Sequence, residues 1–195
     1  MNKLETAGYV KVKNLIDAQT IATISQYFEN KINLGQWVQT PLLTRFDSSK
    51  YGSYGDPLIE VLLKSCLPVI EKETSLELEP TYSFSRVYQE GEELEPHTDR
   101  ESCEISVTVN VACTMNEPWP IWMQYKNNDP VKCMLKPGDA VIYKGCEVMH
   151  WRRPLEKGAI NPQFMLHYVT KDGPNVAYKF DKRAGLGLPP KIQES

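Results

Sequence analysis

The chain has 195 residues, of which 24% are charged, and a formal net charge of −3. Its length suits one domain with a single buried core over residues 1–195, and its slightly acidic balance argues against nucleic acid or an anionic membrane as a partner. No apolar run is long enough to cross a bilayer, and the first residues lack the apolar segment of a secretory signal.

The cysteine content also bears on the compartment in which the protein works. There are five, an odd number, and no two of them form a Cys-x-x-Cys pair. Neither a disulfide framework nor a zinc ribbon is therefore indicated. We expect a cytoplasmic protein.

The N-terminal part begins with a strand and a helix. Residues 8–13 alternate apolar and polar side chains with the period of a half-buried strand. Asp17 is a good N-cap for the helix that follows. Four apolar residues then recur on one helical face, which should pack on a sheet: Ile21, Ile24, Phe28 and Ile32.

Residues 35–55 lose this periodicity. They are rich in Gly, Ser and Thr with scattered aromatic residues, which predicts a long functional loop or lid. Asp56 and Pro57 suit the N-cap and first position of a second helix. Pro68 should kink or end that helix. Residues 1–79 would thus supply a strand, helices and a loop ahead of the main β region.

From residue 80 to 170 the pattern is one of short strands and turns. Asn127-Asn128-Asp129 indicates a hairpin, and Lys136-Pro137-Gly138-Asp139 has Pro and Gly where a type II turn needs them. About eight strands at roughly ten-residue spacing predict a mainly β sandwich or barrel with flanking helices. Residues 171–195 should form a tail on its surface. The strands predicted most clearly are 82–89, 105–112, 122–125, 131–135, 140–143 and 163–170.

His97 and Asp99 form the most informative motif. On an extended backbone, residues two apart face the same way at roughly 6 to 7 Å, which is close to the reach of two ligands of one metal ion. We expect both on the loop between two strands, with His150, 51 residues beyond Asp99, as the third ligand. Two histidines and one carboxylate are the facial triad of non-haem Fe(II) oxygenases.

Other interpretations of these residues remain open. His97 and Asp99 would also suit a solvated turn, and His150 would suit a hydrogen-bonded histidine beside Trp151. His167 is the competing third ligand, but it lies in the middle of a predicted strand and not after a turn.

The order of motifs resembles a known family. Tyr88-Gln89-x-Gly91, Pro96-His97-x-Asp99, Pro137-Gly138-Asp139 and His150 follow one another as in the Fe(II)- and 2-oxoglutarate-dependent oxygenases, in the prolyl 4-hydroxylase-like branch. The motifs around these ligands, together with Trp119-Pro120-Ile121 and Leu166-His167-Tyr168, resemble a group of small phage and bacterial proteins of that branch. The resemblance covers roughly residues 80–170.

The resemblance implies a double-stranded β-helix, or jelly roll, that holds iron in its open end. It implies Fe(II), 2-oxoglutarate and dioxygen as reagents, hydroxylation of a substrate, and release of succinate and CO2. Peptidyl proline is the first substrate hypothesis, and a free amino acid or another small metabolite is the second.

The residue that binds the far carboxylate of 2-oxoglutarate is harder to predict. Prolyl hydroxylases carry Lys or Arg about nine or ten residues after the distal histidine, whereas this chain has Ala159 and Ile160 there. If the backbone is extended there, Arg152 shares a face with His150, and we expect Arg152 to take this role. Tyr88 matches the family's hydroxyl position. The remaining alternatives are Arg86, Arg153, Lys157 and Gln163.

Two other protein classes share the predicted features. A metal-dependent cupin isomerase or hydrolase would have the same barrel and ligands without a need for 2-oxoglutarate, and a jelly-roll binding module would need no metal. Oxidative demethylation of nucleic acid is disfavoured by the acidic balance, and it would predict salt-sensitive binding of DNA or RNA.

Overall fold

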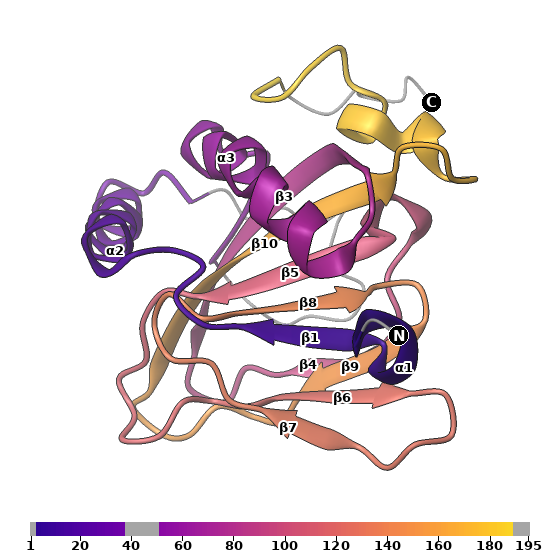
Figure 1. Cartoon of the computed structure of the whole chain (residues 1–195). Coiled ribbons are helices and arrows are strands. Elements are labelled where there is room, and N and C mark those ends of the chain that lie inside the picture. Colours follow the sequence, from indigo (N-terminus) through magenta and orange to yellow (C-terminus); the bar gives the residue numbers. More distant parts are fainter. Residues whose placement is uncertain (1–2, 38–50, 189–195) are drawn as a thin grey trace, which may run out of the picture.

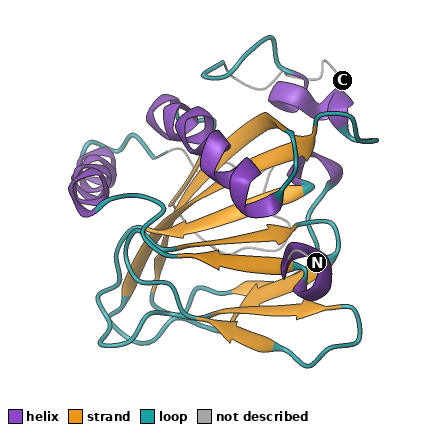
Figure 2. Ribbon diagram, in the orientation of Figure 1, coloured by secondary structure: helices purple, strands orange, loops and turns teal. Residues whose placement is uncertain are grey.

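The computed structural model describes residues 3–37 and 51–188. Within them, two antiparallel sheets lie one above the other, and the two long helices cover the outer side of the larger one (Figures 1 and 2). None of the described helices is long and apolar enough to cross a membrane. The prediction of a mainly β jelly roll with flanking helices is confirmed.

The larger sheet has six strands. Their order is β1 (Tyr9–Val12), β8 (Ala140–Lys144), β5 (Ile105–Asn110), β10 (Ile160–Thr170), β3 (Leu78–Gln89) and β2 (Tyr51–Tyr54). The smaller sheet has four, in the order β4 (Leu94–His97), β9 (Val148–Arg152), β6 (Ile121–Tyr125) and β7 (Val131–Cys133). β6 and β7 form the predicted hairpin.

Both faces of the larger sheet are buried, and they differ in chemistry. In β5 the residues Ile105, Val107 and Val109 join the apolar core under the helices. The alternate residues Ser106, Thr108 and Asn110 are buried as well, on the face turned toward the smaller sheet. The polar interior therefore lies between the two sheets, where a site can form.

The helices begin as predicted. α2 (Ala18–Asn33) starts after Asp17, whose side chain accepts a hydrogen bond from the Thr20 N–H, and α3 (Pro57–Thr74) starts after Asp56 in the same way. A short α1 (Lys3–Ala7) precedes β1.

The second helix does not end at Pro68, because α3 continues to Thr74. Pro68 lies on the exposed side of α3, where water can satisfy the carbonyl that it leaves unbonded. The buried stripe of Leu63, Cys66 and Ile70 runs past it. Burial of that stripe offsets the roughly 3 kcal/mol that an interior proline costs.

Three described strands were not among those predicted most clearly. β2 lies inside the predicted loop 35–55, so that prediction is wrong for residues 51–54, and residues 38–50 of the loop lie outside the described residues. β4 ends at His97, which corrects its expected place in a loop. β9 carries His150. Short strands of this kind are recognised by their partners more than by their own sequence.

The C-terminal segment is tied to the domain by buried charges. It contains short 3₁₀ turns within η2 (Val176–Lys182), after which Arg183 forms an ion pair of 2.5 Å with Glu60 of α3. Both side chains are almost fully buried. Asp181 accepts two hydrogen bonds, of 3.0 and 2.8 Å, from Arg100. The segment thus holds the residue that follows Asp99.

Candidate metal centre

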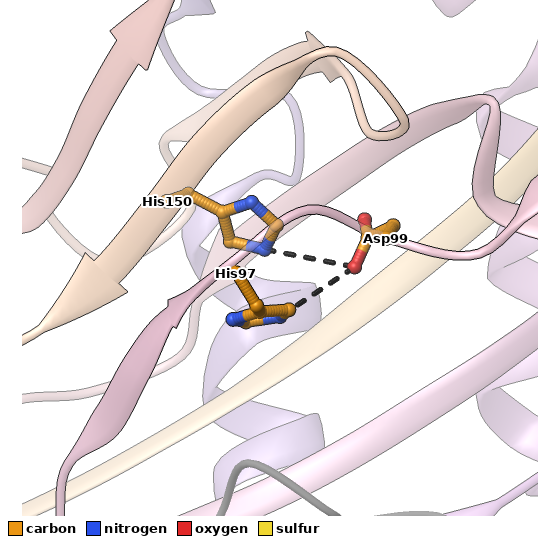
Figure 3. Close-up of side chains that lie close together, drawn as sticks. All are labelled: His97, Asp99 and His150. Atoms are coloured by element: carbon orange, nitrogen blue, oxygen red, sulfur yellow. Dashed lines mark ion pairs between the residues drawn. The ribbon is translucent and has the colours of Figure 1, made fainter.

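His97, Asp99 and His150 converge on one point (Figure 3). β4 and β9 place His97 opposite His150 in register, and Asp99 follows β4. Asp99 Oδ1 lies 3.7 Å from His97 Nε2 and 3.6 Å from His150 Nε2. Two ligands of one ion at roughly 2.1 Å can be up to about 4.2 Å apart, so these atoms can share an ion.

Backbone carbonyls orient both imidazoles. His97 Nδ1 lies 2.7 Å from the Glu95 carbonyl oxygen, and His150 Nδ1 lies 3.1 Å from that of Val148. A carbonyl only accepts, so each Nδ1 carries the proton and each Nε2 has its lone pair toward Asp99. Burial lowers the pKa of His150 and keeps the ring neutral. This is the form that binds a metal ion.

Asp99 is held from the side opposite the imidazoles. Its N–H donates to the Gly145 carbonyl at 2.8 Å, and its Oδ2 accepts from the Ser106 hydroxyl at 2.7 Å. Gly145 packs so closely that a Cβ there would lie 2.0 Å from the Cys103 carbonyl oxygen and 2.6 Å from Asp99 Oδ2. Only glycine fits between β8 and the ligand loop.

Replacing Gly145 by alanine should therefore displace Asp99. We expect metal affinity to fall at least about tenfold and stability to fall by about 1 to 3 kcal/mol, measured by Mn(II) titration and denaturant unfolding. Gly185→Ala is the matched control, because a Cβ at Gly185 meets nothing within 4 Å. Equal metal affinity in the two variants would contradict the close fit.

A cavity of about 130 Å³ opens beside the three ligands. Its wall combines the inward face of β3 with residues of the other central strands. Tyr88 and Gln163, both predicted to bind the cosubstrate, are in this wall. The lining residues are Tyr82, Phe84, Arg86, Tyr88, Leu94, His97, Asp99, Thr108, Tyr143, His150, Gln163, Met165 and His167.

Arg152 lies beside this cavity but is not part of its described lining. Its guanidinium donates to the Trp119 carbonyl at 2.6 Å and to Gln163 Oε1 at 2.7 Å. Burial lowers the pKa of Arg152 to about 10, which leaves it cationic at neutral pH. Two of the alternatives, Arg153 and Lys157, are not in the described lining of the cavity. Arg153 packs over the Trp122 ring, and Lys157 is exposed. Arg152 therefore orients Gln163.

Among the described residues, Arg86 is the arginine that lines the cavity. Its guanidinium lies 5.1 Å from the Phe84 ring centre and 5.3 Å from that of Tyr88, and it donates to Tyr88 Oη at 3.1 Å. Register places it directly opposite Gln163. Burial lowers its pKa, while Tyr88 and Glu92 favour the charged form. A guanidinium, a phenol and an amide thus meet in one wall.

His167, the competing third ligand, lies on the other side of Asp99. Its Nδ1 is 2.9 Å from the Ser106 hydroxyl, and its ring lies 4.6 Å from that of Tyr82. Burial lowers its pKa to about 4. With Asp99 and Cys103 it forms a second group whose ligand atoms lie within 4.8 Å of one another.

Two polar residues of the site, Tyr143 and Ser106, were not predicted from the sequence. Tyr143 of β8 has its hydroxyl 3.4 Å from His150 Nε2, and Ser106 contacts Asp99. The available signal was alternation, because Ser106, Thr108 and Asn110 interrupt an apolar strand with period two. A strand that alternates in this way and is still buried on both faces has a polar interior side.

Comparison with known proteins relates this geometry to a fold. No family model matches the chain, and no curated protein is significantly similar to it. A prolyl-4-hydroxylase of Pseudomonas putida matches with a TM-score of 0.70 and 14% identity over 86% of this chain and 95% of that one. The chain has the fold of the prolyl 4-hydroxylase-like Fe(II)/2-oxoglutarate oxygenases.

Two further structures extend the likeness to oxygenases that hold different bound molecules. A Trichoplax adhaerens prolyl hydroxylase, in complex with a peptide fragment of the hypoxia inducible factor oxygen degradation domain, matches with a TM-score of 0.71 and 15% identity, over 87% of this chain and 86% of that one. EctD of S. alaskensis, with 2-oxoglutarate and 5-hydroxyectoine, matches with a TM-score of 0.63 and 13% identity, over 84% and 72%. The double-stranded β-helix is common to them.

Proposed function

We propose that this protein is an Fe(II)- and 2-oxoglutarate-dependent dioxygenase that hydroxylates a peptide or small-molecule substrate. The observation that carries the proposal is the convergence of two Nε2 atoms and one carboxylate oxygen at the mouth of a cavity that has an arginine in its wall. This donor set, with open positions, suits Fe(II).

His97, Asp99 and His150 would hold the iron. With 2-oxoglutarate and dioxygen, the metal would supply the oxidative chemistry that yields succinate, CO2 and a hydroxylated product. The task of the chain is to bind and orient these reagents and to keep water away from them. The carbonyls behind the two histidines fix the rings, so that their Nε2 atoms would be ready to bind an ion.

The far carboxylate of 2-oxoglutarate would bind Arg86, with Tyr88 and Gln163 beside it. A planar guanidinium matches a carboxylate with two parallel hydrogen bonds. Burial keeps Tyr88 a neutral phenol by raising its pKa. Arg152, our expectation from the sequence, would act one step behind by fixing Gln163 through the bond of 2.7 Å.

Peptidyl proline is our first substrate hypothesis. Its support is the likeness to two prolyl hydroxylases, one of them in complex with a peptide. A free amino acid or small metabolite is second, supported by the likeness to EctD. Proline peptides and free amino acids, each incubated with enzyme, Fe(II) and 2-oxoglutarate, can be compared by the gain of one oxygen atom in the product mass.

The reaction class can be tested before the substrate is known. We expect purified protein with Fe(II), 2-oxoglutarate and dioxygen to release succinate, at a low uncoupled rate that a true substrate raises. A cupin isomerase or hydrolase would release none, and a metal-free binding module would not bind Mn(II). Absence of both succinate release and Mn(II)-dependent binding of 2-oxoglutarate would refute the proposal.

We also propose a reducing compartment such as the cytoplasm. All five cysteines are free thiols, and three of them are buried. An oxidising compartment would select against unpaired thiols in a small domain. Nucleic acid remains disfavoured as a partner by the net charge of −3.

A further inference from the structure

The Ser106 hydroxyl lies at a junction of three groups. It is 2.7 Å from Asp99 Oδ2, 2.9 Å from His167 Nδ1 and 3.1 Å from the Cys103 carbonyl oxygen. Strand register fixes the contact with His167, because the two residues are direct partners in β5 and β10. Ser106 is fully buried.

The chemistry of these groups sets the direction of the hydrogen bonds. A serine hydroxyl has one proton to donate, and the Asp99 carboxylate and the Cys103 carbonyl can only accept. The shorter contact, to the charged oxygen, takes that proton. Of these three neighbours His167 can donate to Ser106, and the Tyr143 hydroxyl, a further neighbour from the paired strand β8, can donate as well. The chain of bonds therefore runs from His167 through Ser106 to Asp99 Oδ2.

This arrangement explains why Asp99, Cys103 and His167 need not be a second metal site. The Ser106 hydroxyl already forms hydrogen bonds with Asp99 Oδ2 and His167 Nδ1. The Cys103 thiol lies 3.1 Å from the Tyr82 hydroxyl. A metal ion would have to displace these bonds. Ser106 and His167 instead support Asp99 on the side away from His97 and His150.

We propose that Ser106 and His167 are positioning residues that keep Asp99 Oδ2 away from the metal, so that the carboxylate offers Oδ1 alone. A carboxylate binds a metal through one oxygen or through both. If the carboxylate binds through one oxygen, the three protein ligands of a facial triad leave open positions for 2-oxoglutarate and dioxygen. Binding through the second oxygen would occupy one of these positions. The inference rests on the proposed iron site.

The experiment uses Co(II), whose visible absorption reports its coordination geometry, in place of iron. Ser106→Ala removes the hydroxyl, and His167→Phe keeps a ring beside Tyr82 but removes the donor. We expect both to weaken Co(II) binding by roughly 10- to 100-fold and to change its absorption bands. His167→Asn, whose amide can donate near the Nδ1 position, should restore the wild-type spectrum.

Ser85→Ala is the matched control. Ser85 is a fully buried serine of β3, and among the described residues its hydroxyl has no hydrogen-bond partner. The variant loses a buried hydroxyl without touching the ligands, so its Co(II) affinity and spectrum should equal those of the wild type. Circular dichroism restricts the comparison to folded variants. Ser106→Ala and His167→Phe each interrupt the chain of hydrogen bonds at a different residue.

The outcomes separate the two proposals. Failure of the wild type to bind Co(II) would refute the proposed iron site. If the wild type binds Co(II), and Ser106→Ala and His167→Phe give the same affinity and spectrum as Ser85→Ala, the positioning role is refuted while the iron site stands. A changed spectrum in both variants, restored by His167→Asn, supports it.

Discussion

Replacing Asp99 by alanine should abolish succinate release and weaken Mn(II) binding at least about 100-fold. Asp99 supplies the negative ligand of the proposed site, and its Oδ1 is the atom that lies within 3.7 Å of both imidazoles. Without it two neutral nitrogens remain, which hold a divalent ion poorly. Isothermal titration with Mn(II), under anaerobic conditions, measures the effect directly.

The control for this variant is Asp129→Ala. Asp129 is an exposed aspartate of the β6–β7 hairpin, and its replacement changes the net charge by the same amount as Asp99→Ala. Wild-type Mn(II) affinity in Asp129→Ala, together with its loss in Asp99→Ala, separates a ligand effect from a general charge effect. Retained Mn(II) affinity in Asp99→Ala would show that Asp99 is not a ligand and would contradict the proposed site.

The parts of the fold that depend on local chemistry could be predicted from the sequence. Asp17 and Asp56 cap their helices as their side chains and positions indicated. The long strands of the larger sheet were predicted from the pattern of strands and turns in residues 80–170, and β1 from its alternation of apolar and polar residues. β2 and β9 were not, because such short strands are stabilised by pairing with β3 and with β4 and β6. Pro68 shows the same limit, since tertiary burial decides its helix.

The candidate site shows a similar division. His97 and Asp99 are close in sequence, so their motif was visible, and His150 was expected as the third ligand, but the pairing of its strand with β4 was not predicted. Arg86 and Tyr88, two residues apart in a strand, share one face of β3 and both line the cavity. The sequence could not show that Trp119 and Gln163 would enclose the guanidinium of Arg152. That enclosure depends on contacts between distant strands.

Replacing Arg86 by leucine should weaken 2-oxoglutarate binding to the Mn(II) protein by roughly 10- to 150-fold. A hydrogen bond to a charged group contributes about 1.5 to 3 kcal/mol, and a factor of ten corresponds to about 1.4 kcal/mol. Leucine keeps an apolar contact with Phe84 and Tyr88 but has no charge for the far carboxylate. Anaerobic calorimetry, which needs no hydroxylation substrate, measures the dissociation constant.

The choice between Arg86 and Arg152 can be made with a second ligand. 2-Oxobutyrate keeps the metal-chelating end of 2-oxoglutarate and lacks the far carboxylate, so the preference of the protein for 2-oxoglutarate measures the contact with that group alone. This preference should collapse in Arg86→Leu. Arg152→Leu should lower the affinity for both ligands more evenly, because its guanidinium acts through Gln163. The opposite pattern, with the preference lost only in Arg152→Leu, would return the anchoring role to Arg152.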